Sequence, residues 1–489
     1  MSRRRKPRSP VTSSIAPKDG TSLGHLSDAD LMKELARRRL AQGKATLDEM
    51  ESFAEEVQRD VGAESLAASI AALPPEDTSP KPCPKCRKPV PVKARNRPRH
   101  ILTVAGEVRL SRNYHHCSTC ELGFYPRDRE LNLPENGEVS DAMERRILDF
   151  GVNDTFDSAA ERWSIHCPHP ISANLVRRVI DRVSERQDAA RSELSLQQAY
   201  RPTPEELPQS LVVAGDGGML LMRDEGWKEA KVAVVARGED FVQQKRRSSV
   251  TQARYVAEFG QAEFRKALEA ALEAERADEV QNVVWLGDGA PENWKMATEL
   301  CPSAIQVLDL PHAIQNAMAC AKKLLGDADA ALPSWQRRIK QLLDAPSPDA
   351  AIAELMDCLP YTTDDEQLGA LDDLIRYYRT NDKRMRYALF REMGLPVGSG
   401  IVESAHRHVL QVRMKRAGQR WALPRARKMA RLRAAYRTAG PRRFHAAIHE
   451  ALLLPTARAH RTLPNGARRA KPRYTLHPGS PLNRAAASN

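Results

Sequence analysis

The segment LVVAGDGGMLL, residues 211–221, joins an apolar run to an aspartate followed by two glycines. The segment VQNVVWLGDGA, residues 280–290, repeats this arrangement, with an aspartate again placed where the apolar run stops. Unbroken apolar runs of this length are typical of strands that are buried on both faces of a sheet. A carboxylate at the end of a buried strand is costly unless it binds something. The two segments therefore predict an α/β sheet with acids at its strand ends.

Strand and helix patterns alternate around these two segments. Strand patterns occur at KEAKVAVVARG (228–238) and AIQVLDLPHAI (304–314), and the second of these runs into a helix. Helix patterns cover roughly 252–277 and 291–300. Strands interleaved with helices indicate an α/β fold. We therefore predict the first part of an α/β core at 210–325.

Residues 326–392 show helix patterns and no strand pattern, which predicts an all-helical insertion. The core then resumes at 393–440, where a helix follows VGSG and carries Glu403 in its first turn. Carboxylates from two strands and a helix, Asp216, Asp288 and Glu403, can hold two Mg²⁺ or Mn²⁺ ions. Two such ions align a nucleophile and a leaving oxygen on a phosphodiester. The three acids are thus candidate catalytic metal ligands.

Asp309 and His312 lie in LDLPH, directly after the fourth strand pattern. His312 could orient a phosphate or a catalytic acid, and Asp309 could replace Asp288 as a ligand. A helix that Asp309 caps, with Pro311 in its first turn, explains the same residues equally well.

The charge of the chain is unevenly distributed. The 489 residues include 76 Lys and Arg and 63 Asp and Glu, which gives a formal net charge of +13. Residues 404–489 hold 20 Lys and Arg and one acid, Glu450, whereas the chain before them is acidic apart from the first eight residues. Strongly basic ends suggest a polyanionic partner, most simply nucleic acid. The alternatives are a role in solubility and an anionic membrane surface.

Several basic residues and one tryptophan are candidate DNA contacts. A solvated basic face is the alternative for each basic residue of the helix that carries Glu403, and a place in the core is the alternative for the tryptophan. The candidates are Arg177, Arg178, Arg407, Arg413, Lys415, Arg416 and Trp421.

Two CxxC pairs, Cys83 with Cys86 and Cys117 with Cys120, have 30 residues between them. Thiolates at this spacing suit one tetrahedral Zn²⁺, and the segment between them predicts a hairpin at Ala105-Gly106, as in a zinc ribbon. Such an ion is structural, since four protein ligands leave no open position. A redox CxxC is the alternative, and one of the two histidines at 115 and 116 could replace a cysteine.

The remaining patterns divide the rest of the chain. TFDSAAERWSI (155–165) and a helix capped by Ser172 are separated by a short turn, which predicts a helix-turn-helix-like DNA-binding segment or an ordinary helical hairpin. The predicted parts are a disordered basic N-terminus (1–25), a helical segment (26–72), the zinc ribbon (81–130), the helix-turn-helix-like segment (139–195) and a disordered basic tail (455–489).

The composition excludes some classes of protein. No stretch approaches the ~18–20 apolar residues of a membrane span, and no apolar segment follows the basic start as in a secretory signal. Eight scattered cysteines do not form the framework of a disulfide-stapled secreted domain. We therefore expect a cytoplasmic protein without a membrane partner.

Five motifs together resemble the bacterial insertion-sequence DDE transposases, closest to the ISKra type. They are GDGG (215–218), WKEAK (227–231), LGDGAPENW (286–294), DLPH (309–312) and GLPVGSGIVES with RMKRAGQRW between 394 and 421. The resemblance covers about 80–437. It implies an RNase H-like mixed sheet interrupted by the helical insertion, and it matches Asp216, Asp288 and Glu403 to the three catalytic acids.

The resemblance also implies a function. Such a transposase binds the terminal inverted repeats of its element and carries out Mg²⁺-dependent strand cleavage and strand transfer into target DNA, as a homodimer or higher assembly in the bacterial nucleoid. Asp309 and His312 match an element near the catalytic acids of related transposases. Two alternatives remain, a non-catalytic transposase-derived DNA-binding regulator and an RNase H-like structure-specific nuclease.

Overall fold

The computed structural model describes residues 27–40, 46–131, 133, 137–167, 169–194, 205, 207–243, 248–398, 400–440, 444 and 468–469. Nearly all of the two terminal segments predicted to be disordered therefore lies outside the described residues. The described chain is multidomain and mixed α/β, and it divides into two compact units, Met1–Met143 and Glu144–Asn489. Each unit is described by itself below.

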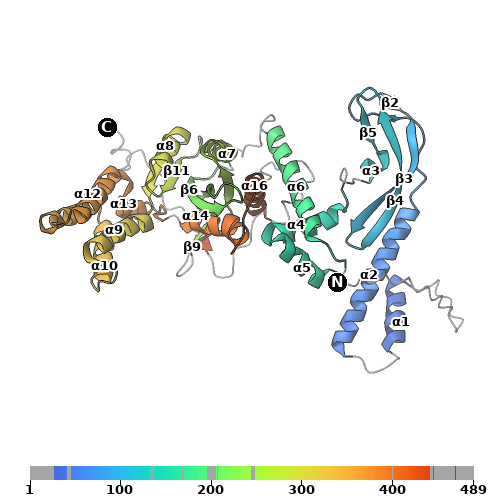
Figure 1. Ribbon diagram of the computed structural model, residues 1–489, viewed down its shortest axis with the longest axis horizontal. Helices are drawn as coiled ribbons and strands as arrows, with labels where there is room; N and C mark the ends of the chain where they lie inside the picture. Colours follow the sequence, from blue (N-terminus) through green and yellow to red (C-terminus); the bar gives the residue numbers. More distant parts are fainter. Residues whose placement is uncertain are drawn as a thin grey trace. The chain divides into compact units, whose positions relative to one another are not determined.

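The first unit begins with two helices and continues as a small antiparallel sheet (Figure 1). The helices are α1 (Asp28–Leu40) and α2 (Leu47–Ala71), and α2 begins with a capping box between Thr46 and Glu49. A three-stranded sheet follows in the order β3-β4-β5, and short β1 (Lys81–Pro82) pairs with β2 (Pro89–Val90). The sheet contains β3 (Val92–Thr103), β4 (Gly106–Cys117) and β5 (Leu122–Phe124), and α3 (Pro126–Glu130) follows it.

The predicted hairpin is confirmed, because Thr103 pairs with Gly106 across the turn at Val104-Ala105. Gly106 has a φ of 134°, a conformation that favours glycine.

The second unit starts with the predicted helix pair. These helices are α5 (Phe156–His166) and α6 (Ala173–Leu194), and α4 (Asp141–Asn153) precedes them. The Thr155 side chain caps α5, and the Ser172 hydroxyl accepts a hydrogen bond from the Leu175 N–H at 3.1 Å, as its predicted capping role requires. Buried Glu144 of α4 forms ion pairs with Arg182 and Arg186 of α6. The three helices therefore pack as one group.

The core of the second unit is a five-stranded mixed sheet in the order β10-β7-β6-β11-β12. The β6–β7 and β7–β10 pairs are antiparallel, whereas β6–β11 and β11–β12 are parallel. The strands are β6 (Ser210–Leu221), β7 (Trp227–Arg237), β10 (Arg254–Phe259), β11 (Asn282–Gly287) and β12 (Ile305–Leu308). Small strands β8 (Phe241–Gln243), β9 (Ser248–Val250) and β13 (Arg468–Arg469) form a separate sheet.

The predicted helix over 252–277 is wrong in its first third, where β10 lies. Gly260, with a φ of 96°, ends this strand, and α7 (Gln261–Ala274) begins after it. β10 is an edge strand whose residues from Val256 to Phe259 are all buried, Glu258 included, so its burial does not alternate. Such a short run is not distinguishable from the start of a buried helix by its period alone.

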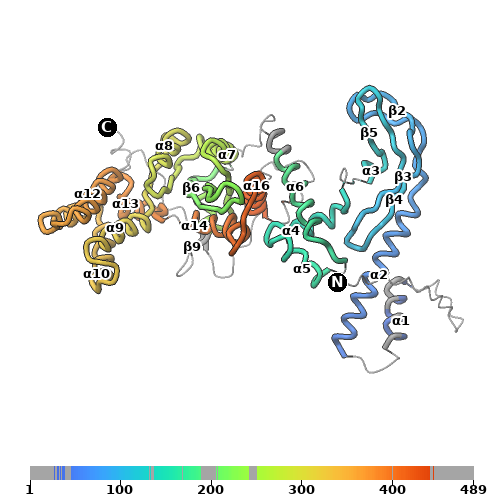
Figure 2. Tube along the Cα trace, in the orientation of Figure 1, coloured from blue at the N-terminus to red at the C-terminus, as the bar shows by residue number. Residues whose placement is uncertain are grey.

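The other helices of the core follow the predicted order. They are α8 (Pro291–Leu300) and α9 (Leu310–Leu325), then the all-helical insertion with α10 (Leu332–Leu343), α11 (Asp349–Cys358), α12 (Asp365–Thr380) and α13 (Tyr387–Glu392) (Figures 1 and 2). Buried residues of the insertion, such as Leu355 and Tyr378, belong to the same apolar cluster as those of the sheet. The Tyr378 hydroxyl also donates a hydrogen bond to the Ala313 carbonyl of α9 at 2.9 Å.

The last part of the core is helical but irregular. α14 (Gly400–Ala405) passes into a π-helix (His406–Gln411) and then into α15 (Val412–Met414), so the predicted helix that carries Glu403 is interrupted by a π-helical segment. α16 (Leu423–Ala439) packs against β10 and α6.

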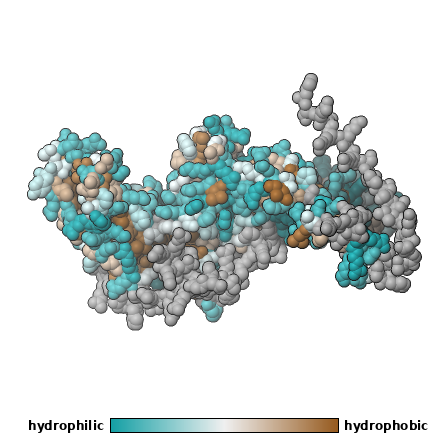
Figure 3. Space-filling view, turned by 90° about the horizontal axis from the view of Figure 1, so that it is seen from below, coloured by the Kyte–Doolittle hydropathy of each residue, from teal (hydrophilic) through white to brown (hydrophobic). Residues whose placement is uncertain are grey.

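The surface of the described residues is largely hydrophilic on the face shown in Figure 3, where hydrophobic residues lie in small groups. Within the described part of the chain, no helix is both long and apolar enough to cross a membrane.

Candidate functional site

Three aspartates lie level with one another across neighbouring parallel strands. Ala214 of β6 is level with Leu286 of β11, and Gly287 of β11 is level with Leu308 of β12. The same offsets place Asp288 between Asp216 and Asp309, and neighbouring strands lie about 4.8 Å apart. The strand arrangement therefore brings together three acids that are up to 93 residues apart in the sequence.

The position of Asp216 differs from the prediction in one respect. β6 continues through both glycines to Leu221, because Gly217 to Leu221 pair with Lys231 to Trp227 of β7. Asp216 consequently lies within its strand and not at its end, whereas Asp288 and Asp309 directly follow β11 and β12.

Asp216 and Asp288 are held by hydrogen bonds to one carboxylate oxygen each. The Asp216 Oδ1 accepts from the Gly217 N–H at 2.7 Å. The Asp288 Oδ1 accepts from the Ala290 N–H at 3.0 Å and from the Asn293 Nδ2 at 3.3 Å. Within the described residues, neither Oδ2 accepts a hydrogen bond, and the Asp216 Oδ2 lies 3.8 Å from the His406 Nε2. Each aspartate thus keeps an oxygen for a cation or a donor.

Asp309 is fully buried and caps α9, as the capping interpretation predicted. Its Oδ2 accepts from the His312 N–H at 3.1 Å and lies against the His312 Nδ1. The hydrogen bond with Asp309 raises the pKa of His312 against the effect of burial, and the charges of Asp288 and Asp216 raise it further. Capping and a place beside the other two aspartates are therefore compatible.

Glu403 lies in α14, which packs against β6 and β7. Its side chain is exposed and has no partner among the described residues. In that part of the chain, the oxygens of Asp216, Asp288 and Glu403 do not all lie within 4.8 Å of one another. The same is true of Asp216, Asp288 and Asp309. The structure thus places the three aspartates level on neighbouring strands and Glu403 on a helix that contacts the same strand as Asp216.

His406 is a site residue whose role the sequence did not predict. Its side chain is buried, and its Nε2 donates a hydrogen bond to the Asp216 carbonyl at 3.0 Å. A Cβ at Gly218 would lie 2.9 Å from the His406 ring, so this glycine permits the contact. The π-helix that begins at His406 is a rare form that is frequent at functional sites. In the sequence, the signal for this contact was Gly218, the second glycine after Asp216.

Tyr377 of the helical insertion also reaches the aspartates. Its hydroxyl donates to the Asp288 carbonyl at 2.9 Å, and burial together with the charge of Asp288 raises the pKa of Tyr377 to about 12. Gly289, with a φ of 101°, makes room for this ring, because a Cβ there would overlap the hydroxyl. The insertion therefore supports the site directly.

Arg413 and Trp421 are interior residues, which corrects their assignment as DNA contacts. Their exposed fractions are 1% and 5%. The Arg413 guanidinium lies 5.1 Å from the Trp421 ring centroid and donates to the Gly151 carbonyl of α4 at 3.3 Å, and burial lowers its pKa to about 10. The Trp421 Nε1 donates to the Met414 carbonyl at 3.0 Å. In this conformation neither side chain is available to a phosphate or a base.

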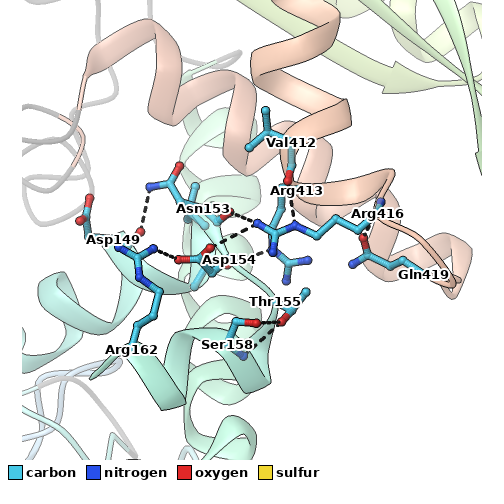
Figure 4. A network of polar contacts seen from close by, with 12 residues as sticks. Asp149, Asn153, Asp154, Thr155, Ser158, Arg162, Val412, Arg413, Arg416 and Gln419 are labelled. Atoms are coloured by element: carbon cyan, nitrogen blue, oxygen red, sulfur yellow. Dashed lines mark hydrogen bonds and ion pairs between the residues drawn. The ribbon is translucent and has the colours of Figure 1, made fainter. Parts of the chain in front are cut away.

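Arg416 is also held within the unit (Figure 4). It forms an ion pair with Asp154 at 3.2 Å and donates to the Asn153 carbonyl at the end of α4. Of the other predicted DNA contacts, Arg178, Arg407 and Lys415 are exposed. Arg177 is partly exposed and lies 3.8 Å from Asp181.

A row of ion pairs joins α6 to α16. Arg425 pairs with Asp181 and Lys428 with Glu185, at 3.3 Å and 2.9 Å. Arg431 pairs with Asp188 and, at 2.7 Å, with Glu258 of β10. These three cations of α16 are therefore paired with acids inside the second unit.

Arg433 joins α4 to the π-helix and has no exposed surface. It donates to the carbonyls of His408 and Val409 in the π-helix and of Val152 in α4. Burial lowers the pKa of Arg433 to about 9. Its guanidinium thus satisfies three backbone carbonyls at once.

We expect Arg433→Met to lower the free energy of unfolding by roughly 3–5 kcal/mol, since each buried carbonyl left unsatisfied costs about 1–3 kcal/mol. Urea unfolding followed by circular dichroism measures this change. Arg420→Met, at an exposed position six residues after Met414, is the matched control and should shift the midpoint little. Equal midpoints for the two variants would contradict the role of Arg433.

The four predicted cysteines form a cluster in the first unit. Their Sγ atoms all lie within 4.8 Å of one another, and the Cys86 and Cys117 sulfurs are 3.6 Å apart. All four thiols are free. The residues that follow the two CxxC pairs, Arg87 and Glu121, have φ values of 61° and 52°. The two knuckles therefore share one turn conformation and could hold a metal ion.

The thiols need a cation to coexist as thiolates. Backbone donors, chiefly the Cys86 N–H, lower the pKa of Cys83 to about 6, whereas the neighbouring sulfur of Cys86 and burial raise that of Cys120 to about 12. His115 is not part of the cluster, because its Nδ1 donates to the Val90 carbonyl at 2.9 Å and its ring stacks on Phe124. Four sulfurs suffice for a tetrahedral ion such as Zn²⁺.

Comparison with known proteins places the chain in a family. A search of curated proteins found no match. Residues 40–448, which cover parts of both units and include the cysteine cluster and the three aspartates, match the uncharacterised protein family UPF0236. Because this match spans most of the sequence, the chain belongs to the UPF0236 family.

Proposed function

We propose that this protein is a DNA transposase that cleaves and joins DNA through Asp216, Asp288 and Glu403. The level placement of Asp216 and Asp288 on neighbouring parallel strands, each with an unused carboxylate oxygen, carries the proposal. Carboxylate oxygens are the ligands that Mg²⁺ prefers. Glu403 would complete the set from α14.

The strand order supports an RNase H-like fold for the core. Numbered along the chain, the five strands lie in the order 3-2-1-4-5, with the first three antiparallel and the last two parallel to the first. In this sheet Asp216 lies on the central strand β6, Asp288 follows its parallel neighbour β11, and Glu403 lies on a helix beyond the fifth strand, β12.

The residues around the acids have positioning roles in the proposed reaction. Asp216, Asp288 and Glu403 would hold two Mg²⁺ ions, and these would supply activation of the attacking water or 3′-hydroxyl and stabilisation of the leaving oxygen. The Gly217 N–H fixes the Asp216 carboxylate, and Asn293 bridges Asp288 to the Gly215 carbonyl at 3.3 Å. His406 holds the backbone at Asp216. Both chemical steps are in-line displacements, so one site serves cleavage and joining.

We further propose that the cysteine cluster binds one structural Zn²⁺ and that the first unit and the helix-turn-helix-like segment contact the ends of the element. Pairing of two ends requires at least a dimer. The expected place of action is the bacterial cytoplasm, on nucleoid DNA.

The test is incubation of the full chain with Mg²⁺ and end-labelled duplexes from both ends of the element that encodes it. Cleaved and joined products on a denaturing gel are the expected result. Cleavage without joining would indicate a structure-specific nuclease. Binding without cleavage in either Mg²⁺ or Mn²⁺ would indicate a DNA-binding regulator.

A further inference from the structure

The segment that carries the cysteine cluster is itself strongly basic. Residues 81–130 contain 12 Lys and Arg and four acids. The acids are largely engaged, since Asp128 is buried between Arg99 and Arg112, and Glu107 lies against His100. The basic character of the chain is therefore not confined to its ends.

Strand β3 presents three of these charges at an edge of the sheet. Lys93, Arg95 and Arg97 are exposed, and none has an ion pair or hydrogen-bond partner among the described residues. β3 pairs with β4 alone, so its other edge has no strand neighbour within the described sheet (Figure 1). We call these three residues the basic strand. They contrast with Arg425 and Lys428 of α16, which are paired with acids of α6.

The backbone of β3 is shaped around the basic strand. Its pairing with β4 slips between Val92 and Ala94 and again between Ala94 and Arg97, so two extra residues bulge from β3. Asn96, with a φ of 52°, lies in the second bulge. Bulges interrupt the alternation of faces and re-aim side chains. As a result, four successive residues from Arg95 to Pro98 are exposed.

We propose that the basic strand binds the sugar-phosphate backbone of duplex DNA. This inference rests on the proposed function, in which DNA is the substrate, and it names a contact surface other than the predicted basic residues around Glu403. Arginine suits this role because its planar guanidinium can bind phosphate through two hydrogen bonds. Charges on an edge strand also prevent pairing with a second sheet, but that role does not require three unpaired cations within five residues.

A triple variant of the full chain, Lys93→Gln, Arg95→Gln and Arg97→Gln, tests the proposal. The probe is a fluorescein-labelled 30-bp duplex of mixed sequence, titrated at several salt concentrations. Removing one cation that neutralises a phosphate should flatten the slope of log K against log salt by about 0.9, so the triple variant should flatten it by about 2.7. At low salt we expect roughly 10–100-fold weaker binding.

The matched control is Lys33→Gln, Arg37→Gln and Arg38→Gln in α1, which removes the same charges from exposed positions that are paired with Asp30 or Glu34. It should keep the slope of the unmodified chain. Equal losses in the two variants, or no loss in the basic-strand variant, would overturn the proposal. The melting temperature and the metal content of each variant should equal those of the unmodified chain if the hairpin is intact.

The test separates this proposal from the proposed function. If the unmodified chain binds duplex DNA and the basic-strand variant does so equally well, the DNA-binding surface lies elsewhere and only this proposal fails. If the unmodified chain binds no duplex at all, the transposase proposal fails with it. If the variant loses affinity for single-stranded DNA of the same sequence but not for the duplex, the assignment of duplex DNA is wrong.

Discussion

Asp288→Asn is expected to reduce DNA cleavage by the full chain at least about 10³-fold, with end binding largely unchanged. The substitution keeps the shape of the side chain and its Oδ1, which accepts hydrogen bonds from the Ala290 N–H and Asn293. It removes the negative charge and replaces the Oδ2 oxygen with an amide NH₂ group, which cannot bind a metal ion. Because metal ions supply transition-state charge stabilisation of several kcal/mol, the loss of a ligand acts mainly on the chemical step.

The measurement compares rates of cleavage at saturating protein with binding of the same labelled duplex. Asp357→Asn in α11 is the matched control, since Asp357 is exposed and lies outside the row of aspartates. Cleavage by Asp288→Asn near the rate of this control would exclude Asp288 as a ligand.

Asp309→Asn separates the two aspartates that follow β11 and β12. Asparagine is as good a helix cap as aspartate, so α9 should remain stable. If Asp309 only caps α9 and orients His312, its variant should retain more cleavage than Asp288→Asn. The reverse order of rates would assign the second metal ligand to Asp309.

The sheet was largely predictable because its strands are unbroken apolar runs that end in polar residues. β6, β7, β11 and β12 lie where the sequence patterns place them. β10 was not predictable by its period, since it is short and leads directly into α7. Because the sequence did not predict β10, it also did not predict the order of the sheet, in which β10 is the outer neighbour of β7.

The candidate acids were predictable by their place after apolar runs, but their mutual register was not. Register depends on which strands are neighbours, and the offsets between β6, β11 and β12 cannot be derived from any one segment. The support from Tyr377 was hidden for a similar reason, because the tyrosine lies 89 residues from Asp288 in sequence. Tertiary contacts of this kind leave no local pattern.

The basic residues after Glu403 were the least predictable part. Charge alone suggests exposure, yet Arg413 and Arg433 are buried and donate to carbonyls at the end of α4. The π-helix adds to the error, since an inserted residue rotates the faces that follow. Val412, an apolar residue directly after the π-helix, is 41% exposed. Function therefore cannot be assigned to these cations by composition.

Replacing a cysteine of the cluster should have the second large effect, a loss of folded structure around the two knuckles. Few other buried residues are described at that end of the hairpin. The buried apolar cluster around the sulfurs contains Val90 and Phe124 besides Cys83 and Cys117. The nearby strands β1 and β2 have two residues each, and β5 has three. Structural Zn²⁺ sites contribute apparent free energies of about 10–16 kcal/mol, far more than such a small core.

On the proposal that the cluster binds Zn²⁺, Cys83→Ser should bind no zinc and its knuckles should unfold, whereas Cys358→Ser should keep both the zinc and the fold. Cys358 is a free, partly buried thiol of α11 and serves as the matched control. Metal content by mass spectrometry should give one Zn²⁺ per unmodified chain, and amide exchange should show reduced protection in β5 and the end of β4 for Cys83→Ser. A metal-free chain with a Cys83–Cys86 disulfide would instead support the redox alternative, because a thiolate can serve either a metal ion or a disulfide but not both.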